Sequence, residues 1–321
     1  MRIGVARSLD RLDIHILRAM TQGNTLFPGV PGLRMSFRAI AKSLQVSEGT
    51  IRMRVGKMSA SGVIAGETVF VNPSLLGLTC GVYGFQVSTT VPKKEVLDSL
   101  KLVDGIVIIQ NHHGSFIGTT FVYGSEEELQ EKTALINKLA HCEVGFFDVM
   151  PFPSCSISLT SLEWKLVSRL VKGKIQSLKI LAGDLGLSER TLKRLLSKLV
   201  DSDAIFTIPI LDLNKIKGSV PADMVCFFTS PESRSHAEPR VLQAIDDYAF
   251  FTGICKGEGL YNLILPNAAV ATELYEKVVK FEGVSFLLVE LVDGRYDQTE
   301  LLGDYVQRRI SLIPELASVK I

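Results

Sequence analysis

Cationic side chains recur at helical spacing in two short stretches of this 321-residue chain, and such side chains can neutralise phosphate groups. In residues 189–200, three leucines (Leu192, Leu196 and Leu199) repeat at helical spacing and leave the cations Arg190, Lys193, Arg194 and Lys198 on the outer face. In Glu48–Ala60, small and basic residues occupy the corresponding outer positions. A basic helix face of this kind is suited to the DNA major groove.

Each of these stretches follows a shorter expected helix and a tight turn. Residues 37–44 place Phe37, Ile40, Ala41 and Leu44 on one face, and Ser47 can cap the helix that follows. The pattern predicts a helix-turn-helix, although an ordinary helical hairpin with solvated charges has the same local pattern. The residues predicted to contact DNA are Arg38, Ser47, Gly49, Thr50, Arg52, Met53 and Lys57 in the first motif, and Ser188, Arg190, Thr191, Lys193, Arg194 and Lys198 in the second.

The two motifs are copies of one another. Residues 40–52 align with residues 181–193 without a gap, at an offset of 141 residues, and Ala, Leu, Ser, Glu and Thr recur at identical positions. Repeats of solenoid proteins are much shorter than this, so the chain is expected to contain a duplicated domain.

Charge follows the same division. The whole chain has a net charge of +1, but residues 1–70 carry +6, residues 71–158 carry −4, residues 159–208 carry +4 and residues 209–321 carry −5. Both basic blocks coincide with the helix-turn-helix motifs, as expected for surfaces that replace the counterions of double-stranded DNA. The acidic blocks should avoid DNA and have another role.

The remaining composition is that of an ordinary globular protein. The N-terminal residues lack the apolar core of a secretory signal, and the uncharged residues 68–92 are interrupted by Pro and Gly, which favours buried strands over a membrane helix. The five cysteines form no CxxC pair, which is typical of free thiols in a reducing compartment. We therefore expect a cytoplasmic protein with no membrane segment.

The acidic blocks have matching patterns of strands and helices. In the first, strands are expected at residues 80–89, 105–110, 115–123 and 144–150 and helices at residues 93–101 and 126–140; in the second, strands are expected at residues 224–229, 250–255, 260–265 and 284–292 and helices at residues 239–248 and 268–281. This βαββαβ order is that of a ferredoxin-like domain. Residues 65–71 and 206–211 are predicted as the wings of the two DNA-binding motifs, and a last helix is expected at residues 299–310.

The predicted fold class is therefore α+β, with two winged helix-turn-helix domains alternating with two ferredoxin-like domains. The predicted domains are residues 1–71 and 153–211 for the DNA-binding units and residues 72–152 and 212–321 for the ferredoxin-like units, the last with its C-terminal helix. A Gly/Pro-rich loop over residues 21–33 has no counterpart in the second copy.

Catalytic motifs are scarce. Asn111-His112-His113 is the one concentration of imidazole groups, and because adjacent side chains of a strand face opposite ways, the two histidines should not share a metal. We expect a polar turn between two strands at this position. No phosphate-binding GxxxxGK[ST], HExxH or GxSxG motif is present, so neither catalysis nor a bound cofactor or metal is expected.

A family resemblance rests on the order of these elements and two motifs. The second helix of each motif (residues 48–60 and 189–200) is the one expected to enter the DNA groove and is called the reading helix below. The first reading helix is followed by Gly62-Val63-Ile64-Ala65-Gly66 and then by a segment from Val71 to Gly77, VNPSLLG, before the βαββαβ pattern begins. This arrangement resembles the Lrp/AsnC family of bacterial and archaeal transcription regulators. The likeness covers most of residues 8–150 and is fainter over residues 159–292.

The resemblance implies DNA binding by the basic blocks, edge-to-edge pairing of ferredoxin-like blocks into a homodimer or larger assembly, and a small effector such as an amino acid. The implied effector-binding residues are Gly114, Gly118, Gly257, Gly259, Tyr261 and Asn262. Family members usually have one unit per chain, so the duplication here would allow an intramolecular pseudo-dimer.

Two alternatives remain. Sirohaem decarboxylases resemble the same family in fold and chain plan, and Phe27-Pro28 and Tyr261-Asn262 are faintly similar to them, which would make the chain a tetrapyrrole enzyme. The other alternative is an architectural DNA-binding protein without an effector. The leading prediction is a sequence-specific transcription regulator.

Overall fold

The computed structural model describes residues 8–22, 36–142, 145–171 and 178–312. Most of the Gly/Pro-rich loop, with Phe27 and Pro28, lies outside the described residues. Within the described residues, no helix combines the length and the apolar run needed to cross a bilayer.

Two three-helix units contain the predicted helix-turn-helix motifs. The first consists of α1 (Arg11–Gln22), α2 (Phe37–Ser43) and α3 (Glu48–Ala60), and the second of α6 (Ser161–Val171), α7 (Leu178–Asp184) and α8 (Glu189–Asp201). Both turns use a left-handed residue at the same point of the repeat, Gln45 with φ 55° and Gly186 with φ 65°. The helices predicted from the apolar spacing are therefore present, and Ser47 and Ser188 cap α3 and α8.

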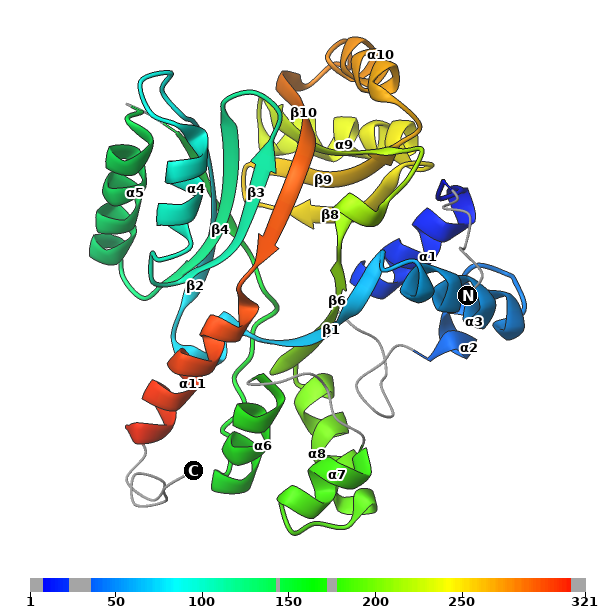
Figure 1. Cartoon of the computed structure of the whole chain (residues 1–321), viewed down its shortest axis with the longest axis vertical. Coiled ribbons are helices and arrows are strands. Elements are labelled where there is room, and N and C mark those ends of the chain that lie inside the picture. Colours follow the sequence, from blue (N-terminus) through cyan, green and yellow to red (C-terminus); the bar gives the residue numbers. More distant parts are fainter. Residues whose placement is uncertain (1–7, 23–35, 143–144, 172–177, 313–321) are drawn as a thin grey trace.

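The strand that follows each reading helix does not form a separate wing. β1 (Ile64–Val71) and β6 (Ile205–Leu211) pair with each other in antiparallel register, with Thr68 opposite Ile208, as a two-stranded ribbon. Because each strand finds its hydrogen-bond partners in the other copy, the predicted wings are replaced by this ribbon, which joins the two helical units (Figure 1).

Each acidic block forms a four-stranded antiparallel sheet with two helices on its outer face. The first block contains β2 (Thr79–Gln86), α4 (Lys93–Leu100), β3 (Ile106–His112), β4 (Phe116–Tyr123), α5 (Glu126–Ala140) and β5 (Phe146–Met150). The second contains β7 (Val220–Phe228), α9 (Pro231–Ile245), β8 (Ala249–Ile254), β9 (Glu258–Leu265), α10 (Ala268–Val278) and β10 (Val284–Asp297). Short 3-10 turns η1 (Pro73–Leu76), η2 (Leu213–Lys215) and η3 (Thr299–Leu301) precede β2, β7 and the final helix α11 (Leu302–Ser311).

The two sheets join into one. Their strand order is β5-β2-β4-β3-β10-β7-β9-β8, and the join is the antiparallel pair of β3 and β10, with Arg295 opposite Gln110. At the other end, the Lys256 amide donates to the Val149 carbonyl at 3.2 Å, so the β8–β9 turn meets β5. The helix-free faces of the two halves therefore face each other, with Phe146 packed edge-on against Phe227. The chain is an intramolecular pseudo-dimer.

Each helical unit packs on the ferredoxin-like block of the other half. One apolar cluster contains Ile16 of α1 and Ile51 of α3 together with Phe250 and Ile264 of the second block. Another contains Leu192 and Leu196 of α8 together with Val107 and Val122 of the first block, and α11 completes it. The helical units are thus exchanged between the halves (Figure 1).

Several predicted boundaries were wrong, among them the start of β7, which lies at Val220, and the ends of β2 and α10, which lie at Gln86 and Val278, and three further cases have identifiable reasons. α9 begins at Pro231, capped by Ser230, and not at Pro239, which lies inside the helix. β10 runs to Asp297 and not to Val292, because its last residues pair with β3. β3 extends through His112, so this histidine lies within a strand and is buried, and the predicted polar turn begins only after it.

Candidate nucleic-acid interface and interdomain cavity

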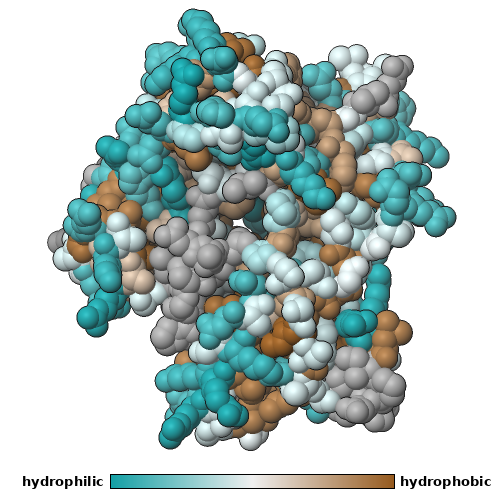
Figure 2. All heavy atoms as spheres, turned by 180° about the vertical axis from the view of Figure 1, so that it is seen from behind, coloured by the Kyte–Doolittle hydropathy of each residue, from teal (hydrophilic) through white to brown (hydrophobic). Residues whose placement is uncertain are grey.

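The exposed face of α8 presents a group of cations. Arg190, Lys193 and Arg194 are exposed, and none of the three forms an ion pair with a described residue. Ser188 caps the helix by accepting from the Thr191 amide at 3.1 Å, and the two hydroxyl groups lie 2.9 Å apart. The cap fixes the start of α8, while the free cations remain available for a polyanion. Hydrophilic side chains gather at this end of the molecule, over α7 and α8 (Figure 2).

Lys198 differs from the other predicted contacts of α8. Its ammonium group binds Oε1 of Glu163 at 2.5 Å, and the Glu163 side chain is only 2% exposed. Burial by itself raises the pKa of Glu163, but hydrogen bonds from Lys198 and Thr160 hold that pKa below its ordinary value. Lys198 lies on the exposed face of α8 as predicted, with its side chain 45% exposed, but its ammonium group is already paired and fastens α8 to α6. Its contact with DNA stays a prediction.

In the first unit Arg54 has a similar fastening role, although it occupies the position of Leu195 in the repeat. Its guanidinium contacts Asp10 at 2.6 Å and Asp13 at 2.8 Å, which fastens α3 to α1. Arg52, by contrast, lies on the surface, pairs with Glu48 at 2.7 Å and stacks over the ring of Phe37 at 5.0 Å. The first reading helix thus has fewer free cations than the second.

Arg54→Ala should destabilise the fold by about 2 kcal/mol, because it removes the guanidinium that ties two partly buried carboxylates at the start of α1 to α3. Arg52→Ala, which removes a pair whose arginine side chain is 65% exposed, should change stability by no more than about 0.5 kcal/mol. Urea unfolding of both variants measures the difference. Equal losses would show that Arg54 does not hold α3 in place.

The remaining predicted contacts in the first unit lie on its outer surface. Arg38 and Lys57 are exposed and form no ion pair within the described part of the chain, and the Met53 side chain is 52% exposed. Ser47 caps α3 by accepting from Thr50 at 3.0 Å. A methyl group at Gly49 would touch only the Ser47 hydroxyl, so this face of α3 is open.

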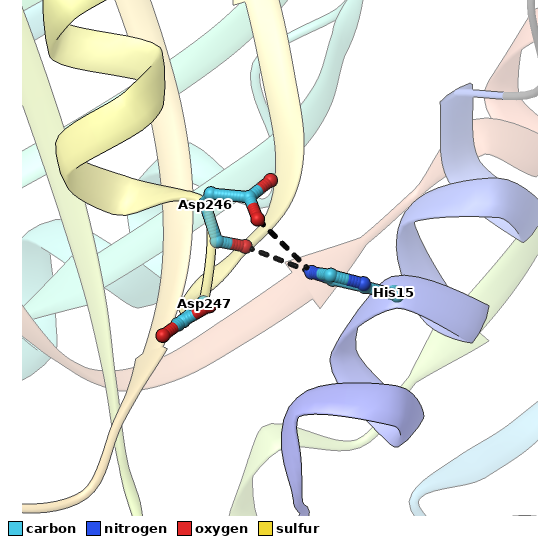
Figure 3. Close-up of side chains that lie close together, drawn as sticks. All are labelled: His15, Asp246 and Asp247. Atoms are coloured by element: carbon cyan, nitrogen blue, oxygen red, sulfur yellow. Dashed lines mark hydrogen bonds and ion pairs between the residues drawn. The ribbon is translucent and has the colours of Figure 1, made fainter. Parts of the chain in front are cut away.

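A cluster of charged groups docks α1 onto the second ferredoxin-like block. His15 lies against Asp246, with its Nε2 atom 3.1 Å from the backbone carbonyl and 3.6 Å from the carboxylate (Figure 3). Arg18 and Arg11 bind the same carboxylate at 2.7 and 2.9 Å, and Arg11 also binds Asp247. Burial alone raises the pKa of Asp246, but these arginines hold it below its ordinary value. His15, Asp246 and Asp247 could geometrically hold a metal, yet two arginines already neutralise them.

A buried polar network joins the two halves. The Asp223 carboxylate on β7 accepts from Gln110 at 2.6 Å and lies 2.7 Å from Nε2 of His112, both on β3, and also accepts from Asn262 on β9. His112 and Asp223 are 2% and 5% exposed. His113, the next residue, faces outward and pairs with Asp293 at 2.8 Å. The two histidines do face opposite ways, as the strand geometry predicted.

The predicted effector-binding residues divide between different environments. Gly114 lies in the β3–β4 turn, and Gly118 lines a small space between the sheets together with Glu258. Gly257 donates to Asp148 at 2.7 Å, and Tyr261 packs inside the second block, with Glu238 as its hydrogen-bond partner. A methyl group at Gly259 would overlap the Tyr261 ring. Tyr261 and Asn262 point to opposite faces of β9, so one effector could not contact all of these residues; their effector role stays a prediction.

Two acidic side chains, Asp148 and Glu258, lie close together where β5 meets the β8–β9 turn. Glu258 is 6% exposed, and both burial and the negative charge of Asp148 raise its pKa to about 7 despite the opposing effect of Arg234. The pair belongs to the contact between β5 and the β8–β9 turn.

A larger cavity of about 130 Å³ lies between the ribbon and the two sheets. Its described lining is mostly apolar, with Arg295 as its one charged side chain. Nε and Nη2 of Arg295 donate to Asp297 at about 3 Å, and Nη1 donates to no described residue. Burial by itself lowers the pKa of Arg295, whereas Asp297 and Asp223 keep it above its ordinary value, so the guanidinium stays charged.

Sequence reasoning missed Asp223, Glu258 and Arg295. The available signal for Arg295 was the alternation in Asp293-Gly294-Arg295-Tyr296-Asp297, which continues the strand pattern past Val292. No comparable local signal distinguishes Asp223 from a surface acid, since its partners come from other strands.

Comparison with known proteins gives partial likeness in sequence and full-length likeness in fold. The chain is 35% identical over 109 residues to the HTH-type transcriptional regulator Ptr1 of Methanocaldococcus jannaschii, a match that covers 34% of this chain and 67% of the relative. It is 32% identical over 101 residues to the regulatory protein AsnC of Haemophilus influenzae, covering 31% of this chain and 61% of the relative. No family model matches the chain.

Among solved structures, the siroheme decarboxylase NirDL matches 94% of this chain and 99% of its own length, with a TM-score of 0.56 and 15% identity. A second NirDL structure, in co-complex with an iron-uroporphyrin III analogue, gives a TM-score of 0.54 and 15% identity, covering 96% of this chain and all of that one. Identity this low shows the shared fold alone. It confirms the predicted α+β architecture over nearly the whole chain. The likeness in sequence to Ptr1 and AsnC identifies the chain as a member of the Lrp/AsnC family, and its fold contains two units of the same plan in tandem.

Proposed function

We propose that this chain is a non-enzymatic transcription regulator that binds duplex DNA through its two helix-turn-helix units, with α8 providing most of the attraction. The observation that supports the proposal most is the group of unpaired cations on α8, Arg190, Lys193 and Arg194, behind a capped helix start. Cations on a helix that follows a tight turn are placed to contact backbone phosphates and base edges. The two relatives identified by sequence are named as regulators.

The ribbon of β1 and β6 connects the two reading helices within one chain, which supports this proposal. α3 leads directly into β1 and α8 into β6, and these strands pair along their length. The separation of the two reading helices is therefore set by the register of the ribbon within one chain. β3 and β10 likewise pair inside the chain, and a further homodimer through the ferredoxin-like blocks stays a prediction.

The test compares two variants with the same change in charge. Arg190→Ala/Lys193→Ala/Arg194→Ala should weaken binding to duplex DNA by about 100-fold, because a net loss of about 1 kcal/mol at each of three contacts sums to roughly 3 kcal/mol, and every 1.4 kcal/mol is about tenfold in affinity. The plot of log affinity against log salt should lose about three units of slope if each cation contacts one phosphate.

The control is Lys256→Ala/Lys277→Ala/Lys280→Ala, three exposed lysines of the second ferredoxin-like block. α10, which holds Lys277, lies at the opposite end of the molecule from α8 (Figure 1). This variant should keep the wild-type salt slope in mobility-shift titrations. Equal weakening by both triple variants would refute the assignment of the interface to α8.

A second candidate function is that of a tetrapyrrole enzyme. The likeness in fold over the full length to siroheme decarboxylase NirDL favours this second function over that of a regulator. The cavity beside the ribbon is the candidate binding site for the tetrapyrrole. However, about 130 Å³ is close to the space that holds a single benzene ring, and a tetrapyrrole has four rings and several carboxylates. The enclosed part of the cavity is therefore smaller than a tetrapyrrole, and the described lining offers one charged side chain, Arg295. Absorbance in the Soret region of protein titrated with an iron tetrapyrrole separates the two functions, since a regulator should leave the spectrum of the free compound unchanged.

A further inference from the structure

The cavity beside the ribbon is bounded by both halves of the chain. Phe70 of β1 and Phe206 of β6 come from the ribbon, Ile108 and Leu260 from the two sheets, and Thr21 from α1. A molecule in this space would therefore contact the ribbon that leads to both reading helices. No residue of the predicted DNA interface lines it.

The walls of the cavity are aromatic. Phe70 and Phe152 stack with ring centroids 5.4 Å apart and planes 7° from parallel, and Phe152 contacts Phe206 at 5.8 Å. An apolar protein cavity of about 150 Å³ holds benzene, so the space of about 130 Å³ here suits one ring with a short substituent. Offset stacking on the existing rings would add to the burial of such a ring.

The polar groups of the cavity select the substituent. The Arg295 side chain is one-fifth exposed, and only part of its guanidinium group is hydrogen-bonded. Nε and Nη2 donate to Asp297, while Nη1 has no partner among the described residues. A carboxylate is the ligand group that matches a free guanidinium edge. No Asp or Glu is among the described residues that line the cavity, so nothing there would neutralise an ammonium group.

We propose that this cavity binds a small aromatic monocarboxylate without an amino group, with its ring against Phe70, Phe152 and Phe206 and its carboxylate on Nη1 of Arg295. The regulatory part of the inference depends on the proposed function: because the ligand lies against β1 and β6, its binding would shift the ribbon and hence the spacing of α3 and α8. The ligand class itself depends only on the cavity.

Calorimetric titration of the full chain with phenylacetate, without DNA, tests the ligand class. Phenylacetate should bind, while 2-phenylethanol, which lacks the charge, and phenylalanine, which adds an ammonium group, should each bind at least about tenfold more weakly. A dissociation constant of about 10 mM corresponds to a binding free energy of only roughly −3 kcal/mol. Failure to detect phenylacetate binding up to that concentration would overturn the proposal. So would binding of phenylalanine as strong as that of phenylacetate.

Two variants locate the site. Arg295→Lys keeps a cation for Asp297 but loses the planar fork, and should weaken phenylacetate binding about tenfold or more. Ile208→Phe, on the ribbon wall, adds a ring to the cavity while Arg295 itself is unchanged, and should abolish binding. Circular dichroism melting shows whether each variant folds, and Arg240→Lys, on the exposed side of α9, serves as the matched control. Binding unchanged by both cavity variants would place the ligand elsewhere and overturn the assignment.

A mobility-shift titration with and without phenylacetate then separates this inference from the proposed function. Phenylacetate should change the affinity for a bound duplex in the wild type and leave it unchanged in Ile208→Phe. A chain that binds phenylacetate but no duplex would keep the cavity assignment and overturn the proposed function. A chain that binds DNA but not phenylacetate would do the reverse.

Discussion

Asp223→Ala is expected to lower the free energy of unfolding by about 3 to 5 kcal/mol, the range for breaking a buried charged contact by removing one partner. The carboxylate is 5% exposed and satisfies Gln110, His112 and Asn262 at once. Without it, His112 and Asn262 remain buried and lose this partner, the half-buried Gln110 loses its acceptor as well, and each unsatisfied buried group adds to the loss. Gln110 and His112 belong to the first half and Asp223 to the second, so the variant also weakens the joint between them.

Asp293→Ala is the matched control. Asp293 pairs with His113, the neighbour of His112, but the two side chains are 42% and 60% exposed. Such a surface pair contributes about 0 to 1 kcal/mol. Guanidinium unfolding of both variants, with His112→Ala and the double variant to complete a cycle, measures the coupling between His112 and Asp223. A loss below about 1 kcal/mol for Asp223→Ala would mean that water or a rearranged side chain replaces the carboxylate.

The elements that local sequence determines were predicted well. The start of α3 follows from Ser47, which caps it as predicted, and Ser188, at the equivalent position of the repeat, caps α8 in the same way. The turns that precede them hold their left-handed residue at equivalent positions of the repeat, Gln45 and Gly186. The order of strands and helices in both acidic blocks also follows from apolar periodicity, because one face of each element must be buried.

Contacts between the copies could not be predicted in this way. The pairing of β1 with β6 and of β3 with β10 joins residues more than 130 positions apart, and no local pattern specifies which edge meets which. Lys198 shows the consequence for the site. Its helical position indicated an outward cation, and only the position of Glu163 on another helix shows that it is already paired. His112 likewise became a core residue because Asp223 approaches it from the other half.

Glu258→Gln is expected to stabilise the chain at pH 8 and to have a much smaller effect at pH 5. The folded state holds the pKa of Glu258 at about 7, above the ordinary value of 4.5, because the carboxyl is buried beside Asp148. Between these two values the folded state binds a proton that the unfolded state has lost, so the wild type loses stability as pH rises from about 4.5 to about 7. Glutamine has the same shape and cannot ionise. The variant should therefore recover about 2 to 3 kcal/mol at pH 8.

Thermal or urea unfolding at several pH values between 5 and 8 measures this effect as a difference between variant and wild type. Asp148→Asn provides the test of cause, since it removes the neighbouring negative charge while Gly257 keeps a carbonyl acceptor in place of the carboxylate. In the Asp148→Asn background the benefit of Glu258→Gln should shrink, because less repulsion then opposes ionisation of Glu258. A pH-independent effect of Glu258→Gln would show that the carboxyl is already ionised in the folded state.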